Sequence, residues 1–282
     1  MGLQIQGGIG HLEELQSVRG LEANDDLIKE LEKLRQLRKL GIGNLKREQG
    51  KALCTAIEKM NHLHTLRVSV IDDGKGILDL HSLSSPPETL RNLILAGGLE
   101  TLPNWISRLD NLVNLNLYNS GLASAHTIKA LQALPSLIKL GLINAYDGEQ
   151  LYIDVGGFPK LKYLMFAGLK GLNSVSIEEG GLPFLQHLQI ESCPQLKVVP
   201  SDIRNLKQLK QLDFFEMPTE LYDRMIPGKG QDYSVIQHIP DVWFGWGDGR
   251  MLTKACTPQE YRDERERQRE KNEESEEVGK VE

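Results

Sequence analysis

The segment Leu112-Val113-Asn114-Leu115-Asn116-Leu117-Tyr118 is the clearest copy of a pattern that returns throughout the chain. The pattern is a leucine, two residues, a second leucine, one residue and a third apolar residue. Successive copies lie 26, 27, 22, 25, 24, 24 and 24 residues apart, and such a period predicts stacked structural repeats. The first leucines of the eight copies are Leu37, Leu63, Leu90, Leu112, Leu137, Leu161, Leu185 and Leu209.

A period in the twenties with this spacing of leucines is typical of a leucine-rich repeat. We therefore predict an α/β fold, a leucine-rich-repeat solenoid with a curved parallel sheet on its concave side and helices and irregular turns on its convex side. Residues alternate across a strand, so Leu115 and Leu117 face the core whereas Asn116 and Tyr118 face outward. With Leu12-Leu15-Val18 interpreted as a weaker ninth copy, residues 1–218 form about nine repeats.

The segments between copies return along the convex side by two kinds of path. The sequences after Leu102-Pro103 and Val199-Pro200 indicate tight returns. Residues 53–60 place apolar side chains on one face of a helix, which indicates a helical return. The asparagine that usually follows the strand is mostly missing, and Ser120 and Cys193 occupy two of these positions. We therefore expect irregular turns after the strands.

Both ends of the chain depart from the repeat. Residues 9–12 match the second half of a tight return with no polar cap before them, so we expect a solenoid that lacks an N-terminal cap and a C-terminal piece of a longer protein. Residues 219–256 break the period and are interpreted as a C-terminal capping segment. Residues 257–282 carry ten acidic and six basic residues, a net charge of −4, and predict a charged disordered tail. A docking helix from Glu260 to Lys271 is the alternative.

Composition excludes several classes of protein. The formal charge of −6 over 282 residues argues against nucleic acid as a partner. No run of eighteen apolar residues or signal peptide occurs, so we expect no membrane span and a cytoplasmic location. Three scattered cysteines do not form a disulfide framework. Neither an Asn-x-Ser/Thr sequon nor a phosphate-binding Gly-x-x-x-x-Gly-Lys loop is present, which favours an intracellular chain that binds no nucleotide cofactor.

The sequence gives little support for a catalytic or metal-binding site. Cys54, His62 and His64 match no zinc spacing, and a solvated histidine pair is the better interpretation. No cysteine has a partnered histidine for nucleophilic catalysis. We therefore predict no enzyme activity, no metal and no cofactor.

The outward positions of the strands predict a protein-binding concave face. Apolar and aromatic residues occupy several of these positions in four consecutive repeats, with basic residues before them and acidic residues after them. A contiguous apolar patch with a polar rim often marks a partner site, and aromatic residues are enriched at binding hot spots. The candidate residues are Arg67, Ile94, Asn116, Tyr118, Ile143, Tyr163, Met165, His187, Glu191, Asp213 and Phe215.

Several segments resemble plant nucleotide-binding leucine-rich-repeat disease-resistance proteins of the coiled-coil subclass. They are Leu27-Ile28-Lys29-Glu30-Leu31, Leu34 to Ile42, Gly50-Lys51-Ala52-Leu53-Cys54 and Asp232 to Pro240. The resemblance implies a protein-interaction module of an immune receptor, acting in pathogen recognition, autoinhibition and defence. Its implied partners are a pathogen effector or a guarded host protein, and the receptor's own upstream nucleotide-binding domain. An intracellular scaffold or a ubiquitin-ligase substrate adaptor built from the same repeats is the alternative function.

Overall fold

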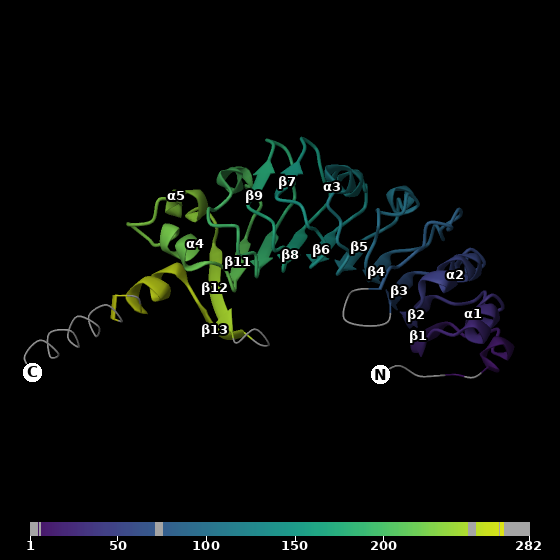
Figure 1. Ribbon diagram of the computed structural model, residues 1–282. Helices are drawn as coiled ribbons and strands as arrows, with labels where there is room; N and C mark the ends of the chain where they lie inside the picture. The colour runs from purple at the N-terminus through teal and green to yellow at the C-terminus, as the bar shows by residue number, and fades with distance from the viewer. Residues whose placement is uncertain (1–4, 6, 71–75, 248–251, 265, 268–282) are drawn as a thin grey trace, which may run out of the picture.

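The computed structural model describes residues 5, 7–70, 76–247, 252–264, 266 and 267. These residues form an arc whose inner side is a continuous sheet and whose outer side carries the helices (Figure 1). In the described residues the long sheet has the order β1-β2-β3-β4-β5-β6-β8-β10-β11-β12-β13. Neighbouring strands from β1 to β12 run parallel, and β13 pairs antiparallel with β12. This architecture confirms the predicted α/β leucine-rich-repeat solenoid.

The strands of the long sheet from β2 to β11 coincide with the eight copies of the repeated pattern. The strands of this sheet are β1 (Ser17–Glu22), β2 (Lys39–Leu45), β3 (Thr65–Val70), β4 (Asn92–Ala96), β5 (Asn114–Tyr118), β6 (Lys139–Ile143), β8 (Tyr163–Ala167), β10 (His187–Glu191), β11 (Gln211–Phe215), β12 (Asp241–Gly247) and β13 (Leu252–Cys256). A second sheet on the outer side pairs β7 (Gln150–Ile153) with β9 (Ser174–Ile177).

The outer side contains the return paths. Asn24 caps α1, because its side-chain oxygen accepts a hydrogen bond from the Leu27 N–H at 2.8 Å. The predicted tight returns contain short 3-10 helices. The α-helices are α1 (Asp25–Leu31), α2 (Gly50–Ile57), α3 (Ala125–Gln132), α4 (Thr219–Arg224) and α5 (Tyr233–Ile236); the 3-10 helices are η1 (Ile9–His11), η2 (Arg47–Gln49), η3 (Ile106–Arg108) and η4 (Ser201–Asn205).

The repeated leucines make one core that runs the length of the arc. Leu112, Leu115 and Leu117 are fully buried, and the equivalent residues of the copies that begin at Leu37 to Leu209 are also buried. Each repeat is too small to cover its own apolar face, so burial depends on the two neighbouring repeats. The core therefore holds the outward-facing side chains of the strands at fixed positions on the concave face.

The turns after the strands are more regular than the sequence suggested. Two residues after the third apolar position, the backbone adopts a left-handed conformation in repeat after repeat, as at Asn119 (φ 52°), Asn144 (φ 48°) and Ser192 (φ 51°). Asparagine and glycine tolerate this conformation best. The asparagine or glycine at 44, 97, 119, 144 and 168 is thus the sequence signal. The prediction of irregular turns was based on the next residue along the chain, such as Ser120 or Cys193. It was wrong, because the residue before it sets the turn conformation.

The first copy of the pattern has a different register from the one predicted. Val18 pairs with Leu40 and Leu21 pairs with Ile42, so the copy is Leu15-Val18-Leu21 rather than Leu12-Leu15-Val18. A bulge adds one residue between Val18 and Leu21, and Gly20 lies there with a φ of 71°. Leu12 is 56% exposed, as expected of a residue outside the core pattern.

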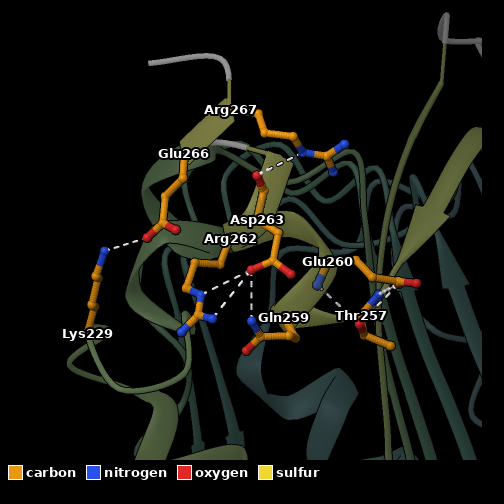
Figure 2. Close-up of polar contacts among 8 residues, drawn as sticks. All are labelled: Lys229, Thr257, Gln259, Glu260, Arg262, Asp263, Glu266 and Arg267. Carbon is orange, nitrogen blue, oxygen red and sulfur yellow. Dashed lines mark hydrogen bonds and ion pairs between the residues drawn. The ribbon is translucent and has the colours of Figure 1, made fainter. Parts of the chain in front are cut away.

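The prediction of a disordered tail is wrong for residues 257–264, 266 and 267. Residues 258–264 and 266–267 are helical. The Thr257 N–H donates to Glu260 Oε2 at 2.7 Å and the Glu260 N–H donates to Thr257 Oγ1 at 3.3 Å, which is a capping box (Figure 2). Tyr261 is buried against Tyr222 and Phe244, with ring centroids 5.5 and 5.8 Å apart.

An ion pair also ties this helix to the segment before it. Lys229 Nζ lies 2.6 Å from Glu266 Oε1 (Figure 2). In the predicted capping segment, β12 pairs parallel with β11 and thus continues the sheet beyond the last repeat. Residues 268–282 of the predicted tail lie outside the described residues.

Candidate functional site

The outward-facing side chains of the concave sheet form three rows, because the strands pair without a register shift from β3 to β12. The row at the start of the strands includes Tyr163 and His187. The middle row is Arg67, Ile94, Asn116, Gly141, Met165, Gln189, Asp213 and Trp243, and the last row includes Tyr118, Ile143, Ala167, Glu191 and Phe215.

All eleven residues predicted for the concave face lie in these rows. Arg67 is exposed. Asp213 lies in the middle row as expected, but its side chain is only 4% exposed. The half-buried residues are Ile94, Asn116, Tyr118, Ile143, Tyr163, Met165, His187, Glu191 and Phe215.

The centre of the face is an apolar patch around Gly141. A Cβ on Gly141 would lie 3.0 Å from Ile143 Cδ1 and would also collide with the Asn116 side-chain oxygen. The side chains of Ile143 and Asn116 therefore cover this glycine. Tyr118 pairs with Ile143, and Met165 pairs with Gly141 from the next strand. We define the central patch as Tyr118, Ile143 and Met165.

Tyr163 is held by its neighbours. Its hydroxyl donates to Gln189 Oε1 at 2.9 Å, and its ring packs edge-on against His187 with centroids 4.8 Å apart. Burial raises the pKa of Tyr163, and the carboxylates of Asp213 and Glu191 raise it further. Tyr163 therefore remains a neutral donor and is a constrained part of the surface.

Asp213 is buried because two side chains satisfy its carboxylate. His187 Nε2 lies 2.6 Å from Asp213 Oδ2, and Gln211 Nε2 donates to both carboxylate oxygens at 3.0 and 3.1 Å. A buried carboxylate needs such partners. Asp213 thus positions His187 and Gln211 rather than offering its own oxygens to a partner.

Opposite charges occupy the two ends of the concave face. Basic residues project from the first three strands, and acidic residues project from β10 and β12. The basic residues are Arg19, Lys39 and Arg67, and the acidic residues are Glu191 and Asp241, with the buried Asp213 on the strand between them.

A set of exposed apolar residues outside the concave face was not predicted from the sequence. Tyr152 of β7 is 48% exposed, and Val155 and Phe184 in the following loops are more exposed still. The Tyr152 hydroxyl bonds to Glu178, and the Val155 N–H donates to Glu178 Oε2 at 2.8 Å. These residues could have been predicted from the sequence, because they are apolar but lie outside the repeated leucine pattern.

The described residues contain no group of three histidine, cysteine or acidic side chains arranged to hold a metal. Cys54 is buried, whereas His62 is exposed. Within the same residues, no helix is long and apolar enough to cross a membrane.

Comparison with known proteins agrees with this architecture. Residues 2–216 match the family described as "Leucine-rich repeat region". The disease resistance protein RPM1 of Arabidopsis thaliana is 34% identical over 86% of this chain and 26% of its own length. Disease resistance protein RPP8 of the same plant is 28% identical over 84% of this chain and 26% of its own length. The chain therefore spans about a quarter of these relatives.

One solved structure also superposes on the chain. It is a leucine-rich repeat protein of Bacteroides thetaiotaomicron, with a TM-score of 0.45 and 13% identity over 83% of this chain and 36% of that protein.

Proposed function

The chain belongs to the leucine-rich-repeat family, and on that premise we propose that it is the protein-recognition module of a plant disease-resistance receptor. The observation that carries the proposal is the concave face, where the half-buried central patch lies between a basic end and an acidic end. The names of the relatives supply the biological setting. Because the chain covers a quarter of those relatives, the receptor activity would need further domains.

Recognition in this proposal is binding without catalysis. The bound protein is a pathogen protein or a host protein that a pathogen alters, and the module keeps the receptor inactive until binding occurs. Tyr118 is the expected anchor, because it is aromatic, half-buried and next to Ile143. Aromatic anchors of this kind often contribute 2 kcal/mol or more to binding. We place the module in the cytoplasm.

The test of receptor membership is association with the rest of a receptor. The chain is co-expressed in leaf tissue with RPM1 from which the matching region has been deleted, and the two are co-immunoprecipitated. We expect association, as required of a module that restrains its own receptor. A folded chain that does not associate would contradict the proposal and would favour a free-standing scaffold.

The test of the recognition surface compares two variants. Tyr118→Ala changes the central patch, and Phe184→Ala changes an exposed aromatic residue in the loop before β10, outside the three rows. Proteins captured from infected leaves are quantified for each variant and for the wild type. Tyr118→Ala should lose a partner that Phe184→Ala retains. Identical capture by all three proteins would show that the central patch does not bind the partner.

A further inference from the structure

We propose that the basic end of the concave face binds the carboxylates of an acidic protein segment. This inference rests on the proposed function and specifies the chemistry of the partner. The site is a hollow of about 550 Å³ lined by residues of β1, β2, β3 and β4. We call it the basic hollow, and its charged walls are Arg19, Lys39 and Arg67.

The hollow exists because its floor is glycine. Gly41 lies between β1 and β3, and it pairs with Arg67. A Cβ added to Gly41 would lie 3.2 Å from the Arg19 Cα, so a larger residue would crowd the floor. Parallel strands lie about 4.8 Å apart, which separates the backbones of Arg19 and Arg67 by roughly 10 Å. Two long arginine side chains that project from backbones at that spacing can both reach one carboxylate placed between them.

The cationic groups of the hollow are available to a ligand. The side chains of Arg19, Lys39 and Arg67 are exposed, and none takes part in an ion pair or hydrogen bond within the described residues. Glu22 also lines the hollow and is already engaged in an interaction. Three cations and one carboxylate leave the hollow with a net positive charge.

Carboxylate chemistry suits this site better than phosphate chemistry. Arginine binds both carboxylates and phosphates through two parallel hydrogen bonds, so the backbone groups around the site distinguish the two anions. Phosphate sites commonly add free backbone N–H groups from a helix N-terminus or a nest. Here β2 and β3 each pair with a strand on both sides, so their amides are largely occupied, and the three cationic residues project from strands rather than from a helix N-terminus. The hollow offers charged side chains without such a cradle.

The hollow is continuous with the proposed recognition surface. Ile94 forms part of its wall and pairs with Arg67 on one side and Asn116 on the other. Tyr118 lies two residues after Asn116 on the same strand. A segment with acidic residues followed by apolar residues would thus occupy the hollow and then the central patch. Charge complementarity of this kind fixes orientation and accelerates association.

The test uses a fluorescein-labelled hexaglutamate peptide and the full chain at low salt, with binding measured by fluorescence anisotropy. We expect Arg67→Glu to weaken binding at least tenfold, and Lys39→Gln to weaken it about threefold. Lys160→Glu is the matched control, because Lys160 is exposed outside the concave face and the change in net charge equals that of Arg67→Glu. Thermal unfolding of each variant verifies that it is folded.

Three results would overturn the proposal. They are equal binding of hexaglutamate to all variants, equal binding of a hexalysine peptide, and tighter binding of inorganic pyrophosphate through the same residues. The last would assign the hollow to phosphate. Failure here is distinguishable from failure of the proposed function, because loss of partner capture by Tyr118→Ala would still stand.

Discussion

Replacing Tyr222 with phenylalanine removes one hydroxyl from the interior of the C-terminal repeats. The side chain is fully buried. Its oxygen accepts a hydrogen bond from the Met217 N–H at 3.1 Å and lies 3.3 and 3.2 Å from the carbonyl oxygens of Phe214 and Gly245. The hydroxyl therefore joins β11, the turn that follows it and β12.

The expected cost follows from the groups left behind. Phenylalanine fills almost the same volume, so little cavity forms. The Met217 N–H and one carbonyl lose a partner, and a buried unsatisfied polar group costs about 1–3 kcal/mol. We therefore expect the free energy of unfolding to fall by about 1–3 kcal/mol. Because repeats contact only their neighbours, the loss should concentrate in β10, β11 and β12.

The assay is urea unfolding followed by circular dichroism, with hydrogen exchange to locate the change. Tyr118→Phe is the matched control, because no hydrogen bond of the described residues involves that hydroxyl. A surface change of this kind should stay within about 0.5 kcal/mol. Equal unfolding midpoints for the two variants would refute the assigned role of the Tyr222 hydroxyl.

Three further outcomes are expected. Leu164→Ala should lower the free energy of unfolding by about 2–5 kcal/mol in urea titrations, because Leu164 is buried, and a loss below 1 kcal/mol would argue against the core assignment. Burial raises the pKa of the Cys54 thiol to about 12, so the folded state resists its ionisation while the unfolded state ionises. Stability should thus fall as pH rises between about 9 and 12, and Cys54→Ala should flatten that fall, whereas an unchanged slope would contradict it. Thr257→Ala should speed hydrogen exchange in residues 258–264, because loss of an N-cap side chain costs a helix about 0.5–2 kcal/mol of stability. Unchanged exchange would show that the capping box does not stabilise this helix.

The C-terminal helix was predicted only as the alternative, because the charged composition of the segment was given more weight than its local helix-start motif. Thr257-Pro258-Gln259-Glu260 has the residues of a capping box with proline at the first helical position. The charged composition after it predicted disorder instead. Tyr261 decides the outcome, because it is buried against Tyr222 and Phe244, and these residues are brought together only in the folded chain.

The alternation of leucines along the chain was sufficient to predict the solenoid, because a residue spacing of two in a strand leaves one face for the core and one for solvent. It was also sufficient to predict which residues line the concave face. It did not predict which of them are available to a partner. Asp213 is bonded to His187, and Tyr163 is bonded to Gln189, because strands whose residues are more than twenty positions apart in sequence lie side by side. The basic hollow likewise depends on β1, β2 and β3 placing Gly41 beside Arg19 and Arg67, a proximity that only the parallel stacking of repeats creates.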